Sequence, residues 1–187
     1  MINFLKKQKL TEAQIAELMA NSETFDAKKR AILLKEGEVC NRIYFVKSGI
    51  LRSGIHDEET RDWTQCFYSS ESLRWAGLSA NCLFGKPSNF FIEVLEDAQI
   101  VAFDKEYFRK LRHMNMEWGN FFQCQLMLTF NYFEQKSIDR FKLTHEKRYI
   151  AFMKAYPKII QSIPQHYIAS YIGILPESLS RIRKRLN

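Results

Sequence analysis

The sequence predicts an α+β protein made of an antiparallel β-roll, a long helix and a C-terminal helix-turn-helix unit. Short segments of alternating polar and apolar residues, separated by glycine or charged turns, run from about residue 23 to residue 103. Many short strands at this spacing favour an antiparallel roll or barrel. The apolar period then changes to three and four residues, which is typical of helices. We therefore expect a roll with an N-terminal helix over 1–112, a long helix over 113–138 and a helical unit over 139–187.

The roll is expected to start after a helix over residues 3–20, in which Thr11 is a plausible N-cap. Strands are then predicted at Ala31–Leu34, Arg42–Val46, Ile50–Ile55, Arg61–Phe67, Phe90–Leu95 and Gln99–Phe103.

After a short helix over 105–112, a long helical pattern begins near Asn115 and runs towards Ile138. Its apolar residues spread over more than one face, so the helix needs cover on more than one side. We expect one side to lie on the roll and the other to pair with the same helix of a second copy. The alternative is a helix buried within a single monomer. The apolar positions are Trp118, Phe121, Phe122, Leu126, Met127, Phe130 and Phe133.

The C-terminal unit begins with a helix over 144–156, capped by Thr144, and ends in two short helical patterns around a glycine turn. Pro164 and Pro176 suit the first positions of helices, and Gly173 supplies a left-handed residue between them. Ile174 is an apolar plug in the turn. The second helix is expected to turn an apolar stripe inward at Leu179, Ile182 and Leu186.

Positive charge is concentrated in the same unit. Residues 140–187 hold ten Lys/Arg and two Asp/Glu, a net charge of +8, and the whole chain has a net charge of +7. Localised positive charge beside a helix pair of this kind indicates nucleic-acid binding. The alternative is an ordinary packing element with a solvated basic face.

Composition narrows the remaining classes. The 187 residues are 46% hydrophobic and 26% charged, which suits a globular chain with a substantial core. No apolar run approaches the roughly 18–20 residues of a membrane span, and the first residues lack the features of a signal peptide. We therefore expect a cytoplasmic protein without a membrane partner.

The four cysteines are Cys40, Cys66, Cys82 and Cys124. They form no CxxC pair, and no histidine lies at metal-ligand spacing from them. In a reducing compartment such residues are most simply small buried hydrophobes. We therefore expect no metal, no iron–sulfur cluster, no redox role and no other bound cofactor.

The order of elements resembles the cyclic-AMP receptor/FNR superfamily of bacterial transcription regulators. The resemblance is carried by Ile-Ala-Ser-Tyr-Ile-Gly-Ile at 168–174 and by Pro-Glu-Ser-Leu-Ser-Arg at 176–181, which is similar to the superfamily's Glu-Thr-Val-Ser-Arg signature. Lys35–Glu38 and Tyr44–Gly49 resemble the first strands of its cyclic-nucleotide-binding-like jelly roll. The C-terminal pattern is closest to the short members of Bacteroidetes-type bacteria.

The resemblance implies a homodimeric, sequence-specific transcription regulator that binds double-stranded DNA and is not an enzyme. RNA polymerase is a further expected partner. Glu177 and Arg181 would read bases, since a glutamate accepts from cytosine N4 and an arginine bonds guanine O6 and N7. Other DNA contacts would come from Ser178, Ser180, Arg183, Lys184 and Arg185.

The same resemblance locates a candidate ligand pocket in the roll. The superfamily's pocket needs a Gly-Glu pair for the ribose and an arginine for the cyclic phosphate. Here Ser88 stands at the arginine position, and Leu78 or Ser79 at the glutamate position. A buried phosphodiester without a cation is costly, so we expect no response to cyclic AMP; the effector stays unidentified. The candidate pocket residues are Arg74, Trp75, Leu78, Ser79, Lys86 and Ser88.

Two other classes of protein are alternatives to a DNA-binding regulator. A metal-binding cupin or roll-type enzyme wants at least two histidines on neighbouring strands, whereas only His56 lies in the predicted roll. A small-ligand or protein-binding roll without DNA-regulatory activity is the second alternative. The salt dependence of binding to random duplex DNA would distinguish it, because a DNA-binding regulator shows a steep slope.

Overall fold

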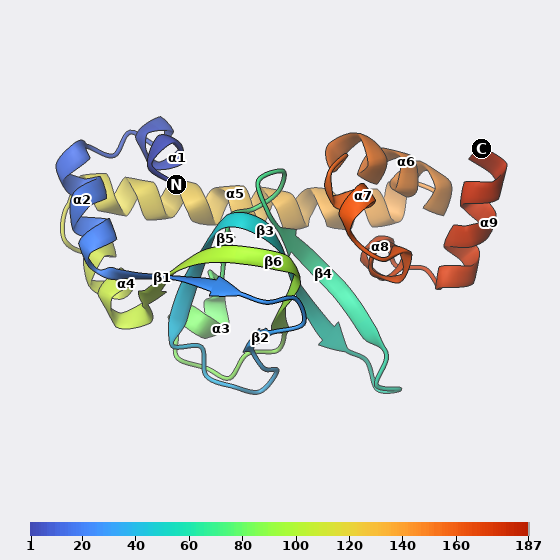
Figure 1. Ribbon diagram of the computed structural model, residues 1–187, viewed down its shortest axis with the longest axis horizontal. Helices are drawn as coiled ribbons and strands as arrows, with labels where there is room; N and C mark the ends of the chain where they lie inside the picture. The colour runs from blue at the N-terminus through green and yellow to red at the C-terminus, as the bar shows by residue number, and fades with distance from the viewer. Residues whose placement is uncertain (187) are drawn as a thin grey trace.

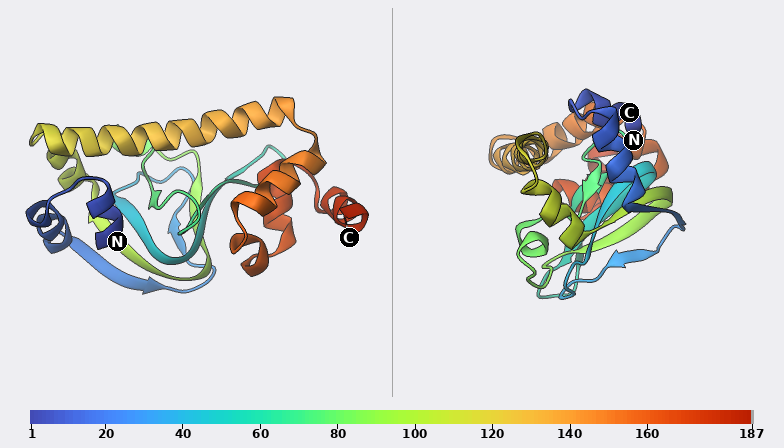
Figure 2. Two further views of the ribbon diagram at one scale, coloured as in Figure 1. Left: turned by 90° about the horizontal axis from the view of Figure 1, so that it is seen from above. Right: turned by 90° about the vertical axis from the view of Figure 1, so that its left-hand side faces the viewer.

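The computed structural model describes residues 1–186 and places a curved antiparallel sheet between two groups of short helices, with the C-terminal group at one end (Figure 1). One long helix, α5 (Met116–Lys142), runs along both parts, and the C-terminal helix lies at the far end from the roll (Figure 2). The strands are β1 (Ser22–Ala27), β2 (Ile32–Leu34), β3 (Arg42–His56), β4 (Asp62–Tyr68), β5 (Trp75–Ala76) and β6 (Phe91–Asp104).

Strands β3 and β6 form the centre of the sheet. β1 and β2 pair with β6, while β4 and β5 pair with β3, so the main path has the order β1-β6-β3-β4. Every one of these pairings is antiparallel, which confirms the predicted kind of sheet.

The prediction of separate strands at Arg42–Val46 and Ile50–Ile55 was wrong, because β3 continues through both. The same is true of Phe90–Leu95 and Gln99–Phe103, which β6 joins. The polar residues between them form bulges instead of turns, and the register between β3 and β6 shifts there. Gly49, at the bulge of β3, has a φ of +84°. Bulges bend paired strands, so these shifts help to curve the sheet into a roll.

The other helices flank the sheet or form the C-terminal unit. They are α1 (Ile2–Lys7), α2 (Glu12–Ala20), α3 (Ala80–Leu83), α4 (Lys105–Arg112), α6 (His145–Ala155), α7 (Ile159–Ser162), α8 (Gln165–Ile172) and α9 (Pro176–Leu186). Although α5 has 27 residues, none of the helices in residues 1–186 has an apolar stretch long enough to cross a membrane.

Local capping signals decide several helix ends. The Thr11 and Thr144 side chains accept N–H groups at the starts of α2 and α6, as the sequence predicted. The single helix predicted over 3–20 is instead two helices, since the chain leaves the first one at Lys9, whose φ is +64°. The long helix extends to Lys142, beyond the predicted end at residue 138.

The core of the roll is rich in aromatic rings, and α5 contributes to it. The rings of Phe45 and Trp75 lie 4.9 Å apart between centroids, and Trp75 also lies 6.1 Å from Phe121 of α5. Trp118 and Phe122, on the same side of α5, are buried as well. The prediction that one side of the long helix lies on the roll is therefore confirmed.

The cysteines differ from the expectation in two respects. Cys40 and Cys82 are joined by a disulfide, so they are not free small hydrophobes. This pairing could not be predicted from the sequence, because the two residues are 42 positions apart and meet only when α3 folds against the segment before β3. Cys66 is buried and free, as predicted, whereas Cys124 is free and exposed.

The bulge at Gly49 gives a stability prediction. A methyl group there would lie 2.5 Å from the Asp97 carbonyl oxygen, whereas a methyl group at Gly37, also at positive φ, would meet nothing within 4 Å. Both alanine substitutions carry a backbone penalty of about 1–2 kcal/mol, and only Gly49→Ala adds a collision of about 1–3 kcal/mol. We expect urea titration to show a clearly larger loss of unfolding free energy for Gly49→Ala. Equal losses would mean that the bulge relaxes around the methyl group.

Candidate nucleic-acid interface

Helices α8 and α9 are joined by a tight turn at Gly173. This residue has φ 78° and ψ 41°, the left-handed region that favours glycine. The N–H of Ile174 donates to the Ala169 carbonyl at 3.0 Å and closes the end of α8. Ile174 is buried, so the apolar plug predicted for the turn is present. Pro164 differs slightly from the prediction, since it directly precedes α8 instead of being its first residue.

The two faces of α9 differ sharply. Leu179 and Ile182 are buried, as predicted, but Leu186 is 40% exposed and does not extend the inward stripe. It lies in the last turn, beyond the reach of α8. The predicted DNA-contacting side chains lie on the remaining surface of α9: all are exposed except Ser178, which is half-buried, and they comprise Glu177, Ser178, Ser180, Arg181, Arg183, Lys184 and Arg185.

A basic hollow lies between α9 and the start of α6. Its volume is about 710 Å³, and Ser178, Arg181, Lys184 and Arg185 contribute to its wall. The sequence did not point to the residues on its other side, Thr144, His145 and Glu146. They lie at the N-terminus of α6, where the helix dipole adds partial positive charge. The sequence marks Thr144 as a helix cap, and it carries no other signal for this side of the hollow.

Few of the cations on α9 are neutralised. Arg185 pairs with Glu146 at 3.1 Å, on side chains that are largely exposed. Within residues 1–186, no carboxylate lies within ion-pair distance of Arg181, Arg183 or Lys184. This surface therefore keeps most of its charge available for an anionic partner.

The helical unit that carries α9 is docked on the edge of the roll through α8 and β4. The Ser170 hydroxyl accepts the N–H of Thr64 at 3.1 Å and lies 2.8 Å from the Thr64 hydroxyl. From α5, the Lys136 ammonium donates to the Gln65 carbonyl at 2.6 Å and lies 3.9 Å from the centre of the Tyr171 ring. Burial lowers the pKa of Lys136 to about 8. Polar contacts thus join all three parts of the molecule.

Arg52 is the buried charge at this contact. Its guanidinium lies between two rings, 4.9 Å from the centre of Phe91 and 4.3 Å from that of Tyr167 in α8. It donates to the Glu93 carboxylate at 2.6 and 2.8 Å and to the Asp62 carboxylate. Nothing in the local sequence distinguishes Arg52 from a surface arginine, so sequence reasoning missed it.

The candidate ligand-pocket residues do not form one site with the DNA-binding residues. Trp75 belongs to the aromatic core, and Leu78, three residues later in the chain, is also buried. Ser79 caps α3 through its hydroxyl, whereas Ser88 is buried and donates to the Phe90 carbonyl at 2.7 Å.

The two basic members of the set point elsewhere. Arg74 donates to the Val46 carbonyl at 3.2 Å and lies 5.9 Å from the Phe4 ring, whereas Lys86 is exposed. A cavity of about 970 Å³ does exist, but it lies between β4, α5 and the helical unit, and none of the six residues lines it.

A curved antiparallel roll, a long connecting helix and a small basic helical unit follow one another along the chain. Residues 25–115 match the family model described as the cyclic nucleotide-binding domain. No curated protein matches the sequence significantly.

Solved structures place the whole chain in one fold. FixK2 from Bradyrhizobium japonicum has 16% identity and a TM-score of 0.78, over 88% of this chain and 84% of that one. A transcriptional regulator of the Crp/Fnr family from Eubacterium rectale has 21% identity and a TM-score of 0.76, over 96% and 85% of the two chains. The c-di-GMP-responsive global regulator CLP of Xanthomonas campestris has 15% identity and a TM-score of 0.69, over 94% and 91%. The predicted resemblance is thus confirmed: residues 25–115 match the cyclic nucleotide-binding domain, and the chain shares its fold with Crp/Fnr-family transcription regulators.

The contact at Arg52 gives a second prediction. Breaking a buried, hydrogen-bonded ion pair costs about 3–5 kcal/mol, whereas a surface pair contributes about 0–1 kcal/mol. Arg52→Met should therefore lower the free energy of unfolding by several kcal/mol. Arg42→Met is the matched control on β3, because Arg42 pairs with Glu23 where both side chains are half exposed. Similar losses in the two variants, measured by chemical denaturation, would contradict a special role for Arg52.

Proposed function

We propose that the chain is a sequence-specific DNA-binding transcription regulator that acts as a homodimer in the cytoplasm. The observation that carries the proposal is the outward face of α9, where Arg181 and Lys184 are exposed opposite the buried Leu179 and Ile182. A helix held from behind by an apolar stripe, with free cations in front, suits the major groove of DNA. The Crp/Fnr fold of the solved relatives supports the same proposal.

The residues on α9 divide into two roles. Glu177 and Arg181 lie one helical turn apart and would contact base edges. Arg183, Lys184 and Arg185, with the hydroxyls of Ser178 and Ser180, would mainly hold the phosphate backbone. The N-terminus of α6 borders the basic hollow and would face the same backbone.

A homodimer is supported by the side of α5 that faces away from the roll. Starting at Met116, the residues at alternating four- and three-residue steps are all exposed, the spacing of a coiled-coil seam. They are Met116, Asn120, Gln123, Met127, Phe130, Glu134, Ser137 and Phe141. Phe130 is 60% exposed and Phe141 is 86% exposed. Apolar residues aligned on one helix face mark an interaction surface, and a second α5 has the matching seam.

We expect that cyclic AMP is not the effector. The resemblance implies that Ser88 occupies the position of a phosphate-binding arginine, and its hydroxyl is already hydrogen-bonded to the backbone of Phe90. The proposal assigns no catalytic step to the chain, and RNA polymerase remains a predicted partner. A ligand- or protein-binding roll without regulatory activity is the alternative; such a protein would lack the steeply salt-dependent binding to random duplex DNA that a regulator shows.

Base reading by Arg181 can be tested directly. A preferred duplex is first selected from a randomised pool with the unaltered protein, and dissociation constants are then measured by fluorescence anisotropy. We expect Arg181→Ala to weaken binding to the selected duplex by about 1–3 kcal/mol and to relax the preference at one base pair. Arg109→Ala, at an exposed arginine of α4, is the control and should change nothing. Equal weakening by Arg181→Ala on selected and random duplexes would contradict base reading.

The dimer seam can be tested with two exposed phenylalanines. Phe130→Glu places charges opposite each other in the seam, so light scattering should report the mass of one chain where the unaltered protein gives two. Phe84→Glu alters a phenylalanine outside α5 that is even more exposed, at 75%, and should leave the dimer intact. A monomeric parent protein, or a dimer that survives Phe130→Glu, would rule out this seam.

The absence of a cyclic AMP response can be tested by thermal unfolding. A ligand that binds only the folded protein raises its melting temperature with concentration. We expect cyclic AMP, titrated to millimolar levels, to leave the melting temperature unchanged, because no cation is placed for its phosphate. A dose-dependent rise would overturn this part of the proposal.

A further inference from the structure

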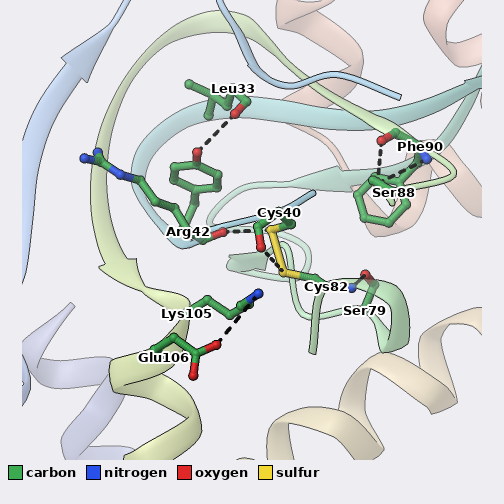
Figure 3. Close-up of a disulfide and its surroundings, with 10 residues drawn as sticks. Leu33, Cys40, Arg42, Ser79, Cys82, Ser88, Phe90, Lys105 and Glu106 are labelled. Atoms are coloured by element: carbon green, nitrogen blue, oxygen red, sulfur yellow. Dashed lines mark hydrogen bonds and ion pairs between the residues drawn. A yellow bond between two sulfur atoms is a disulfide. The ribbon is translucent and has the colours of Figure 1, made fainter. Parts of the chain in front are cut away.

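The disulfide joins the segment before β3 to the short helix α3. Cys40 and Cys82 have Cα atoms 5.1 Å apart, and each residue is 1% exposed (Figure 3). We propose that this pair is a reversible thiol–disulfide site, which exchanges with a dithiol/disulfide couple and thereby controls DNA binding. Only its last step, the effect on DNA, rests on the proposed function.

The surroundings can accept both redox states. The sulfur of Cys40 lies 3.1 Å from the Arg42 carbonyl oxygen, and the sulfur of Cys82 lies 3.8 Å from the carbonyl oxygen of Cys40. After reduction, each thiol hydrogen therefore has an acceptor within reach. Burial of a new polar hydrogen then carries little penalty.

A lysine side chain extends toward the pair. Lys105 starts α4, its N–H donates to the Asn41 carbonyl at 3.0 Å, and its side chain is only 12% exposed. In Figure 3 the side chain extends toward the two sulfurs, and its ammonium lies 3.8 Å from the half-exposed Glu106 carboxylate. A nearby cation favours the thiolate, which is the reactive form in disulfide exchange. In contrast, burial raises the pKa of Cys66 to about 12, so that cysteine stays a protonated thiol.

Reduction needs one dithiol molecule and no other reagent. A thiolate of the dithiol attacks one sulfur, the Cys40–Cys82 bond breaks, and the released cysteine takes up a proton. The second thiolate of the dithiol then attacks the mixed disulfide, freeing the other cysteine, which is also protonated. Two electrons and two protons reach the protein, and the dithiol leaves as a cyclic disulfide. Oxidation by a small disulfide reverses these steps.

Access to the sulfurs requires only a local opening. Helix α3 is four residues long, Cys82 is its one buried residue, and the following Phe84 is 75% exposed. Short surface helices open at far lower cost than the sheet beneath them. A reductant can therefore reach the bond without unfolding the roll.

The disulfide also helps to hold α3 in place. The segment after α3 is attached by backbone hydrogen bonds: the Gly37 N–H donates to the Ser88 carbonyl at 2.6 Å, and the Ser88 N–H donates to the Glu38 carbonyl at 2.9 Å. The disulfide attaches α3 itself, through Cys82. Helix α3 contacts α4, which packs on α5, and α5 bears Lys136 at the contact with the helical unit. Release of α3 thus alters the support of the helix that carries the seam and the DNA-binding end.

The first experiment counts thiols in the Cys124→Ser variant, because the exposed Cys124 would itself form a mixed disulfide with glutathione. The variant equilibrated with oxidised glutathione should show one reactive thiol after denaturation, and the variant treated with dithiothreitol under native conditions should show three. Three thiols after oxidation, or a bond that dithiothreitol cannot reduce in the folded protein, would overturn the reversible site.

The second experiment measures control. The two redox forms should differ at least about fivefold in dissociation constant for the selected duplex, the lower range of typical coupling, and Cys124→Ser should keep this difference. Cys40→Ser and Cys82→Ser should each abolish it while keeping the far-ultraviolet circular dichroism of the parent. Equal affinities of the two forms would leave a static crosslink and refute the control.

If neither redox form binds duplex DNA, the proposed function fails separately. Hydrogen exchange over residues 80–112 then decides the switch: faster exchange in the reduced form supports it, and unchanged exchange overturns it.

Discussion

The sheet of this protein is apolar on both faces, and the rest of the structure depends on covering the outer one. Ile50, Phe67 and Leu95 share one buried cluster with side chains of the C-terminal helices, separate from the interior of the roll. Burying one isoleucine, leucine or phenylalanine side chain stabilises the folded state by about 1.5–3 kcal/mol. The helical unit therefore supplies the cover that the outer face of the sheet needs. Polar groups buried in such a contact need partners. Ser170 meets Thr64 only when α8 docks in this position, whereas Arg52 is paired with Glu93 and Asp62 within the roll and contacts α8 through the Tyr167 ring.

The orientation of α9 is inherited from this contact. Helix α9 packs on α8, and its single ion pair reaches α6. A shift of β4 against α8 would therefore move the basic face as a rigid unit. The link from Lys136 to the Gln65 carbonyl ties the long helix into the same arrangement. The surface that would meet DNA is thus positioned from the roll, although its chemistry resides in eleven residues.

Helix α5 connects the two ends of the molecule. Its first half packs into the roll through Trp118 and Phe121, and its second half reaches the helical unit. The disulfide between Cys40 and Cys82 lies near the first half, beside α4. One continuous helix can therefore carry a change in packing from α3 to the contact with α8, and it presents its free side to a second copy along the way.

Local interactions account for what the sequence alone determined. Propensity and periodicity predict features that depend only on neighbours within a few positions. These features are the turn at Gly173, the caps at Thr11 and Thr144 and the amphipathic pattern of α9. Only tertiary structure decided that the polar residues around Gly49 form a bulge, since that outcome requires the opposing strand β6. The buried site of Arg52 and the meeting of Cys40 with Cys82 likewise join segments far apart in the chain. Their partners are set by how the sheet curves and what covers it, and no local pattern encodes that.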